Sequence, residues 1–353
     1  MQVEKLIPEI KDNIWGGVRL IEKYGKLTDK RPCAESWELS LHKDGESRLE
    51  SGVPLSSVLD KEALGENASD FEFFPMLIKF IDARDNLSVQ VHPSDSYALK
   101  NENSYGKTEM WYIVDCDEGA GIYLGFSRDV TEDEVRAAIE DNSLTSLMNF
   151  FPVKPGECYF IPSGTIHAIG AGVLILEIQQ NSNLTYRVYD YGRLDKDGKP
   201  RELHVEKALK VLNYKKYTKR ALSGNLLGIS KYFAVTRHSV SGETHFPLDS
   251  RTFRSLSVTE GSGTLNGIPV SAGDSYFIPA TEKSFTLDGN LTAVIAEVRK
   301  YSLTVQSTEN AHRVTVDDDL GRRIYSAYGE SPEILSREAL EALNLTESDV
   351  TFK

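Results

Sequence analysis

Four side chains of this 353-residue chain have the types and the spacing of a metal site. Gln90 and His92 stand two residues apart in LSVQVHPSD, so both side chains leave the same face of an extended strand. Glu109 opens the apolar run of GKTEMWYIV, and His167 follows a Pro-Ser-Gly turn in YFIPSGTIHAIG. Two imidazoles, a carboxylate and an amide oxygen suit a borderline divalent cation, zinc first, with positions left for substrate oxygens or water. We therefore expect one Zn²⁺ per chain, bound inside a small β-barrel.

This prediction depends on the four residues together. A single histidine in an apolar run is more often a hydrogen-bonded core or surface residue than a metal ligand. The remaining histidines have no comparable neighbours, and we interpret them as structural or exposed: His42, His204, His238, His245 and His312.

Short β-rich runs separated by Gly, Pro and Asn dominate the chain, which is typical of a barrel or sandwich. The expected strands of the metal-binding region are Met76–Ile81, Leu87–Val91, Met110–Val114, Gly156–Ile161 and Val173–Gln179. A few helices should decorate this core. Thr131 and Glu134 form a capping box, Glu202–Leu212 has helical periodicity, and Ser336 is positioned to cap Arg337–Leu343.

An internal repeat predicts a duplicated architecture. PGECYFIPSGTIH, from Pro155, aligns without a gap to AGDSYFIPATEKS, from Ala272, and HPSDS, from His92, has a weaker echo in FPLDS, from Phe246. The second copy has Ser284 in place of His167 and Phe246 in place of His92. We therefore expect two barrels, of which the first alone binds metal in this way.

Composition restricts the classes of function. A net charge of −13 disfavours nucleic acid as a partner, but it permits a small phosphorylated substrate, because one phosphate needs only two or three local cations. Three scattered cysteines indicate a reducing compartment and no disulfide framework. No run is apolar for long enough to span a membrane, and MQVEKLIPEI has acidic residues where a signal peptide would not. A cytoplasmic enzyme is the expectation.

Several motifs together resemble the type I phosphomannose isomerases in their short bacterial form. These are Trp15-Gly16-Gly17, Glu35-Ser36-Trp37-Glu38, LSVQVHP, GKTEM, PSGTIHAIG and TYRVYDYGR, in a match that runs from about Trp15 to about Val298. The resemblance implies a double-cupin zinc enzyme that interconverts mannose 6-phosphate and fructose 6-phosphate through a zinc-stabilised cis-enediol. The chain departs from longer members at Asn183, where they have Asp, and Arg299–Lys353 matches nothing in the family.

The resemblance also assigns roles to residues. The Gln-x-His ligand pair of the family falls on Gln90 and His92, its Lys-x-Glu on Lys107 and Glu109, and its late His ligand on His167. Its active-site Arg falls on Arg187, and a Ser associated with phosphate falls on Ser88.

The residue types themselves fit this chemistry. Moving a carbonyl from C1 to C2 of an aldose removes a proton from the neighbouring carbon and leaves negative charge on oxygen, which a cation must stabilise. Lys107 should share the face of Glu109, where a neighbouring metal would lower its pKa and make it a candidate base. The alternative is that Lys107 only balances the charge of Glu109. Arg187 offers a planar fork for phosphate or enediolate oxygens, against the alternative of a surface ion pair.

We expect a metal-binding catalytic domain over 1–230, a second cupin-like domain over 231–298 and an extension of unknown role over 299–353. The oligomeric state is expected to be a monomer or a homodimer. Two other functions remain open at this point: an Fe(II) cupin dioxygenase, against which Gln90 and Lys107 count, and a non-catalytic sugar-phosphate sensor.

Overall fold

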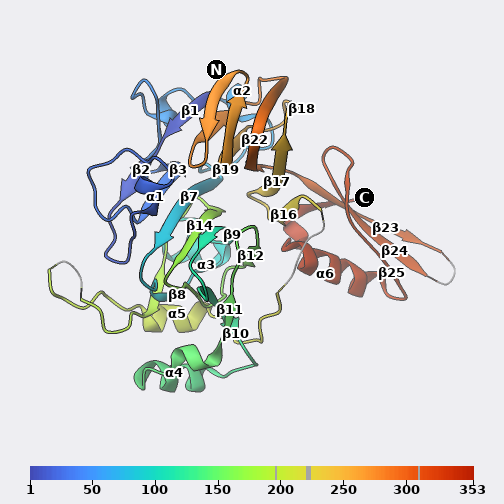
Figure 1. Ribbon diagram of the computed structural model, residues 1–353. Coiled ribbons are helices and arrows are strands. Elements are labelled where there is room, and N and C mark those ends of the chain that lie inside the picture. The colour runs from blue at the N-terminus through green and yellow to red at the C-terminus, as the bar shows by residue number, and fades with distance from the viewer. Residues whose placement is uncertain (195–196, 220–223, 309–310) are drawn as a thin grey trace.

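The computed structural model describes residues 1–194, 197–219, 224–308 and 311–353, and is built mainly from β-strands. Sheets of six and five strands face each other in the first barrel, a nine-stranded sheet forms the second, and a four-stranded sheet with one helix projects from their side (Figure 1). The predicted mainly β architecture of two tandem cupin barrels is confirmed.

The first barrel consists of the six- and five-stranded sheets. In spatial order the six strands are β12 (Cys158–Ile161), β9 (Glu109–Cys116), β14 (Val173–Gln180), β7 (Met76–Ala83), β3 (Glu35–Leu39) and β2 (Glu9–Lys11). The five strands are β11 (Met148–Pro152), β10 (Gly121–Phe126), β13 (His167–Ile169), β8 (Val89–Val91) and β15 (Tyr186–Tyr189). All five strands expected for this region are present, with ends shifted by up to two residues.

Strands β7 and β14 are buried on both faces along their whole length. Alternate residues of β14, such as Leu176 and Ile178, pack into a core shared with the second barrel, whereas Val173 and Ile175 face the inside of the first barrel. This alternation follows from the two-residue period of a strand. It turns every second residue of both strands toward the barrel interior.

Helices cover the outer face of the five-stranded sheet. They include α3 (Asp95–Asn101), α4 (Glu132–Glu140), α5 (Val205–Val211) and η2 (Leu144–Leu147). The short helices elsewhere in the barrels are α1 (Arg19–Glu22), α2 (Lys61–Leu64) and η1 (Leu55–Ser57). Val135 of α4 and Leu209 of α5 pack in one core with Val89 and Val91 of β8. The predicted capping box of Thr131 and Glu134 is confirmed.

The second barrel repeats part of the first. Its strands are β16 (Leu226–Ile229), β17 (Ala234–Ser241), β22 (Ser284–Glu297), β19 (Arg254–Leu265), β21 (Ser275–Ile278), β1 (Glu4–Ile7) and β6 (Arg48–Leu49), with β18 (Thr244–Pro247) on β22 and β20 (Ile268–Ser271) on β19. A separate hairpin joins β4 (Leu41–His42) to β5 (Gly45–Glu46). Strand β21 occupies the repeat position of β12, and Ser284 begins its strand as His167 begins β13.

The repeat positions of His92 and His167 carry Phe246 and Ser284 in the second barrel. Phe246, at the repeat position of His92, stacks on Phe285 with ring centroids 4.7 Å apart and planes inclined by 7°. Both rings lie in or against the core of this barrel. The duplicated position therefore serves packing.

The first strand of the chain crosses to the second barrel. Strand β1 pairs with β21, from Glu4 opposite Phe277, and β16 joins the same sheet before residue 231. The nine-stranded sheet therefore contains strands from both sides of the expected boundary between 1–230 and 231–298. Pairing across more than 250 residues leaves no signal in the local pattern of the sequence.

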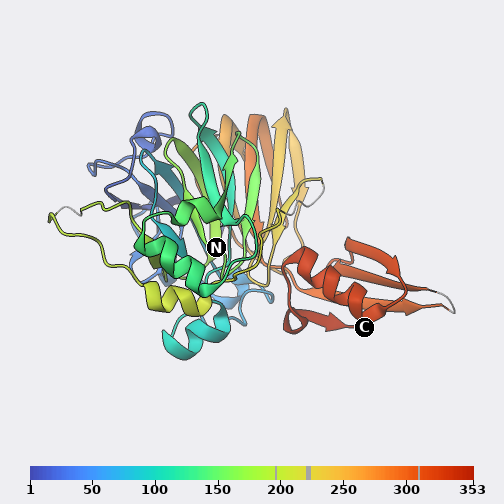
Figure 2. The same ribbon diagram turned by 90° about the horizontal axis from the view of Figure 1, so that it is seen from below.

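The extension forms a sheet of its own beside β16. It consists of β25 (Arg323–Gly329), β24 (His312–Asp318), β23 (Tyr301–Ser307) and β26 (Val350–Phe352), with α6 (Pro332–Leu343) and η3 (Glu347–Asp349) (Figure 2). Its core contains Ile229 and Ala234 of the second barrel together with Leu303 and Leu340. The extension is therefore folded and docked through a shared apolar core.

The predicted start of the last helix was wrong. Helix α6 begins at Pro332, with the Ser331 hydroxyl accepting from the Ile334 N–H, and Ser336 lies inside it. Proline is well suited to a first helical position because its missing N–H is not needed there.

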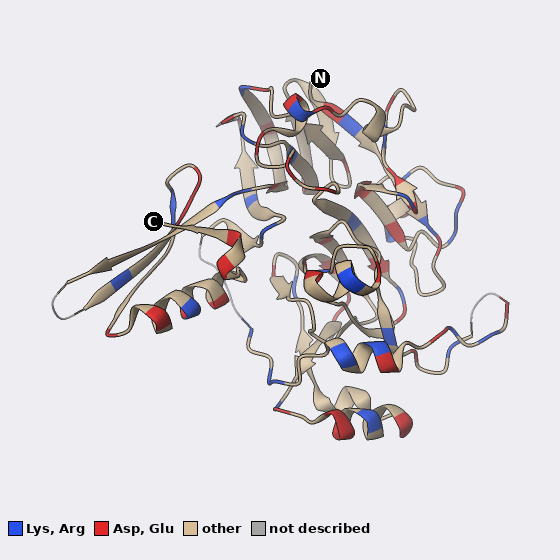
Figure 3. Cartoon of the chain, turned by 180° about the vertical axis from the view of Figure 1, so that it is seen from behind, with Lys and Arg blue, Asp and Glu red and all other residues tan. Residues whose placement is uncertain are grey.

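No helix among the described residues has the length and hydropathy needed to cross a membrane. Acidic and basic residues alternate along the helices and loops in the view of Figure 3.

A buried polar contact should fix the extension to the barrels. Asn67 Nδ2 donates to Asp319 Oδ2 at 2.6 Å, and Asp319 Oδ1 lies 3.5 Å from Arg299 Nη1. Asp319→Asn removes the charge that faces this buried guanidinium, and we expect it to lower the free energy of unfolding by about 1–3 kcal/mol in urea titrations.

Asp317→Asn is the matched control, since Asp317 pairs with the half-exposed Arg323 and should cost at most about 1 kcal/mol. Equal losses of unfolding free energy in the two variants would show that Asp319 does not hold the extension in place.

Candidate metal centre and active site

Two rows of paired residues bring the functional side chains together. In the six-stranded sheet, Glu177 of β14 lies opposite Lys79 of β7 on one side and Trp111 of β9 on the other. In the five-stranded sheet, His167 lies opposite Gln90, which lies opposite Arg187. Because directly paired residues point to the same face of a sheet, strand register alone gathers residues far apart in the sequence.

His92, Glu109 and His167 form a compact buried group whose ligand atoms all lie within 4.8 Å of one another. Glu109 Oε1 is 3.3 Å from His167 Nε2, and Glu109 Oε2 is 3.6 Å from His92 Nε2. The terminal amide nitrogen of Gln90 lies 3.3 Å from His167 Nε2. All four predicted ligands therefore converge.

Backbone carbonyls fix both imidazoles with Nε2 facing Glu109. His92 Nδ1 lies 2.7 Å from the Leu184 carbonyl oxygen, and His167 Nδ1 lies 2.8 Å from that of Thr165. A carbonyl only accepts, so Nδ1 carries the proton and Nε2 keeps its lone pair as an acceptor. Burial lowers the pKa of both imidazoles, that of His167 to about 4, which favours the neutral form that binds metal.

The donor set fits a divalent cation. Glu109 is fully buried, and its Oε1 atom accepts no hydrogen bond from the described residues. A buried carboxylate oxygen without a donor is costly, and two unprotonated imidazole nitrogens beside it make a cation the natural partner. His92, Glu109, His167 and Gln90 are the residues that would hold it.

Lys107 lies between this group and a second buried carboxylate. Its Nζ is 2.7 Å from Glu109 Oε2, 3.3 Å from His92 Nε2 and 3.5 Å from Glu177 Oε1. Burial acts to lower the pKa of Lys107, but Glu109 and Glu177 outweigh it and raise the pKa. The protein groups alone therefore oppose the lowering that we expected from a neighbouring metal.

Glu177 is the functional candidate that the sequence prediction missed. Burial acts to raise its pKa, yet Lys107 and Lys79 hold the pKa below its usual value, and Trp111 Nε1 donates to Glu177 Oε2 at 3.0 Å. The signal was present as a charged residue in the middle of each of two apolar runs, Glu177 in VLILEIQQ and Lys79 in MLIKFIDA. A charge in the middle of a strand that is buried on both faces requires a partner of opposite charge. Here Lys79 and Glu177 are partners of each other.

A cavity of about 520 Å³ opens beside these groups. Ser88, Gln90, Lys107 and Arg187 all line it, together with Glu177, which was not predicted. Its charged lining residues are five cations, Lys11, Lys79, Lys107, Arg187 and Arg201, and three acids, Glu35, Asp44 and Glu177. The cavity therefore has a surplus of positive charge, although the whole chain is acidic.

Arg187 has the surroundings of an anion site. Its Nη1 donates to the Glu202 carbonyl at 2.8 Å, but its Nε is buried without an acceptor among the described residues. Burial and then the nearby Arg201 lower its pKa. Among the described residues Arg187 forms no ion pair, so the alternative of a surface ion pair is not observed.

Comparison with protein families gives two matches along the chain. Residues 3–146 match the catalytic domain of type I phosphomannose isomerase, and residues 225–298 match the cupin domain of mannose-6-phosphate isomerase. The extension lies beyond both matches.

Similar proteins cover the same region. A probable mannose-6-phosphate isomerase of Bacillus subtilis is 38% identical over 311 residues, which span 82% of this chain and 98% of the relative. The mannose-6-phosphate isomerase of Streptococcus mutans is 36% identical over 81% of this chain and 95% of its own length. The crystal structure of a Bacillus subtilis mannose 6-phosphate isomerase superposes with a TM-score of 0.77 at 34% identity, over 84% of this chain and 99% of that one. The chain therefore belongs to the type I phosphomannose isomerase family.

Proposed function

We propose that the chain performs its family's reaction, the interconversion of mannose 6-phosphate and fructose 6-phosphate, in the cavity beside His92, Glu109 and His167, with zinc as the metal. The observation that carries this proposal is the pair of fixed imidazoles whose unprotonated Nε2 atoms face Glu109, beside a cationic cavity that Gln90 and Lys107 line. Bound there, zinc supplies Lewis-acid stabilisation of the negative charge that develops on the sugar oxygens.

Lys107 is the group that we propose to exchange a proton with the sugar at C1 or C2. Its Nζ lines the cavity next to a proposed ligand, and Glu109 and Glu177 hold it from two sides. Such positioning restricts Nζ to one place, as proton transfer with a bound carbon requires. The neutral amine, which a neighbouring zinc would favour, is the form that would take the proton from the sugar.

Arg187 and Ser88 are proposed to bind the phosphate. Arg187 has a free buried Nε, and Ser88 is a buried hydroxyl on the same wall of the cavity. The guanidinium fork can donate two hydrogen bonds to one phosphate, and Arg201 adds charge at the same end.

Metal content tests the proposed ligands. We expect elemental analysis to find about one zinc per chain, and His167→Ala, which removes one of four ligands, to lose most of it together with isomerase activity. His245→Ala is the control, since His245 is exposed on β18, and it should keep zinc. Wild-type protein without a transition metal, or zinc that survives in His167→Ala, would contradict the ligand set.

Lys107→Met tests the proton-transfer role. We expect this variant to keep its zinc while kcat/KM for mannose 6-phosphate falls by about 10²–10⁴, the usual contribution of a positioned acid or base. Lys79→Met is the matched control, because Lys79 Nζ lies at the same 3.5 Å from Glu177 Oε1 but is not in the group around Glu109 and His92. Its kcat/KM should fall by less than about tenfold.

A zinc-loaded Lys107→Met enzyme with near-normal turnover would remove Lys107 from the mechanism. Equal losses of kcat/KM in both lysine variants would show instead that the effect comes from removing a cation beside Glu177.

Phosphate recognition predicts a strong substrate preference. Each lost charge-assisted hydrogen bond should cost roughly 1.5–3 kcal/mol, so free mannose should react far more slowly than mannose 6-phosphate, and Arg187→Lys should lower kcat/KM for the phosphorylated sugar about 10- to 100-fold. Arg193→Lys is the control, since Arg193 pairs with Asp190 and does not line the cavity. Comparable kcat/KM for the two sugars would contradict the assignment.

A further inference from the structure

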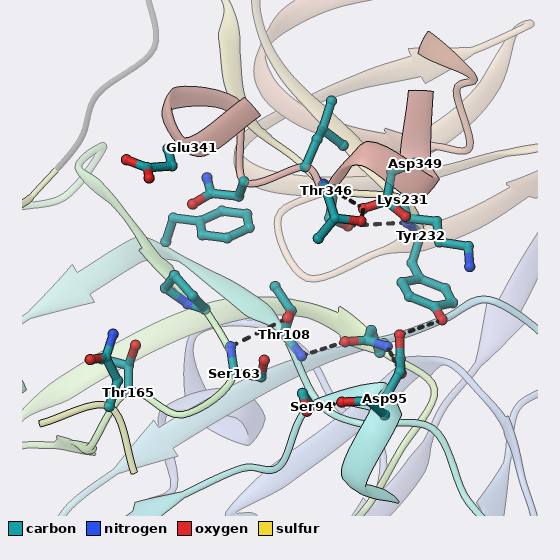
Figure 4. Close-up of a pocket in the computed structure, with 18 of the residues that line it drawn as sticks. Ser94, Asp95, Thr108, Ser163, Thr165, Lys231, Tyr232, Glu341, Thr346 and Asp349 are labelled. Carbon is teal, nitrogen blue, oxygen red and sulfur yellow. Dashed lines mark hydrogen bonds between the residues drawn. The ribbon is translucent and has the colours of Figure 1, made fainter. Parts of the chain in front are cut away.

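A second cavity, of about 630 Å³, lies between the first barrel and the extension (Figure 4). Loops of the barrel form one side, and the extension closes the other with Glu341, Asn344, Leu345, Thr346, Ser348 and Asp349. These six residues lie outside both family matches. The cavity has the size of a small-molecule site and does not share a lining residue with the cationic cavity.

The two cavities lie on opposite sides of the segment that runs from Lys107 into β9 at Glu109. Thr108, between them, lines the second cavity, as expected from alternation along an extended chain, while Lys107 lines the first. Thr165 also lines the second cavity, and its carbonyl fixes His167 Nδ1. The wall of the second cavity is therefore the back of the proposed metal site.

A chain of hydrogen bonds makes this wall rigid. The Tyr232 hydroxyl donates to Asp95 Oδ2 at 2.8 Å, Gln180 Nε2 donates to Asp95 Oδ1 at 2.9 Å, and the Thr108 N–H donates to Gln180 Oε1 at 2.7 Å (Figure 4). The Gly106 N–H also donates to Asp95 Oδ1, at 2.9 Å. Preformed walls reduce the ordering cost of binding a ligand.

Polar groups without protein partners face this cavity. Thr165 is only 7% exposed, yet within the described chain its hydroxyl forms no hydrogen bond, and the same holds for the side chains of Ser163 and Asn344. A nearly buried hydroxyl that faces a cavity without a protein partner is a position for a hydrogen bond to a ligand or to water.

The charge of the lining indicates the class of ligand. Three cations, Lys215, Lys216 and Lys231, meet three acids, Asp95, Glu341 and Asp349, whereas the first cavity has five cations and three acids. Hydroxyl and amide side chains make up much of the remaining lining, and Phe160, Tyr217 and Tyr232 offer aromatic surface. Balanced charge, many hydrogen-bonding groups and aromatic rings suit a ligand with many hydroxyls, apolar C–H faces and no net charge.

We propose that the cavity between the first barrel and the extension is a second binding site, which takes an uncharged carbohydrate through Thr165, Ser163 and Asn344. This site is distinct from the place where sugar phosphate reacts, and the extension completes it.

Direct binding tests this proposal without reference to turnover. The probes are methyl α-mannoside and methyl β-glucoside, uncharged pyranosides whose blocked anomeric carbon prevents isomerisation. Titration calorimetry of the full-length, metal-loaded protein should show saturable binding of at least one of them at millimolar concentration, and the binding should persist with saturating fructose 6-phosphate in the first cavity.

Substitutions locate the site. Thr165→Val keeps the side-chain shape without the hydroxyl, and Asn344→Gly removes the amide at a left-handed position (φ 54°) that glycine tolerates. Each should weaken pyranoside binding about two- to tenfold, the range for one neutral hydrogen bond. Asn142→Gly is the matched control: Asn142 is also left-handed (φ 62°), follows α4 and does not line the cavity, so affinity should not change.

Three results with the pyranosides, and a fourth with inorganic phosphate, would overturn the proposal. The three are absence of saturable binding for both pyranosides up to tens of millimolar, complete displacement by fructose 6-phosphate, and unchanged affinity in both Thr165→Val and Asn344→Gly. Inorganic phosphate that binds this cavity in preference to the pyranosides would overturn it as well.

Discussion

The charges inside the first barrel are the constraint on which the site depends. Lys79, Lys107, Glu109 and Glu177 are all buried, and each would be unfavourable alone, because removing an ion from water costs several kcal/mol. Strand pairing places Lys79 opposite Glu177, and Lys107 joins Glu177 to Glu109. The four formal charges sum to zero, so a divalent cation at Glu109 leaves a positive surplus that a phosphorylated sugar can neutralise. The cations of the cavity wall reinforce that preference.

Much of this arrangement could be predicted from local patterns in the sequence. The two-residue spacing of Gln90 and His92 and the turn before His167 indicated both the ligands and the strands that carry them. Glu177 and Lys79 were missed because the contact between them depends on the register of strands about a hundred residues apart, which no local pattern encodes. The same reason explains β1, whose partner lies near the far end of the second barrel. The prediction that Ser336 caps the last helix was wrong for a local reason, since Ser331 and Pro332 offer a better helix start five residues earlier.

The duplication shows how one scaffold can carry either a group of side chains able to hold a metal or a pair of stacked aromatic rings. In the first barrel the repeat positions carry His92 and His167, and backbone carbonyls fix both rings with Nε2 facing Glu109. In the second, Phe246 lies on Phe285, and the corresponding strand begins with Ser284. Replacing ionisable groups by stacked rings removes the desolvation cost of polar groups and adds apolar burial. The second barrel can therefore support the first, through the core that they share, without needing a ligand of its own.

The place where the extension docks has a consequence for how the chain is assembled. Strand β16 is the edge of the nine-stranded sheet, and Ile229 at its end lies in the core of the extension. An uncovered sheet edge can recruit a strand from another molecule and so begin aggregation. Because the extension needs Ile229 and Ala234 to complete its core, it can close only after β16 and β17 have formed. During synthesis on the ribosome it also emerges after them, so Ile229 and Ala234 beside that edge lack their apolar neighbours in the extension until it docks.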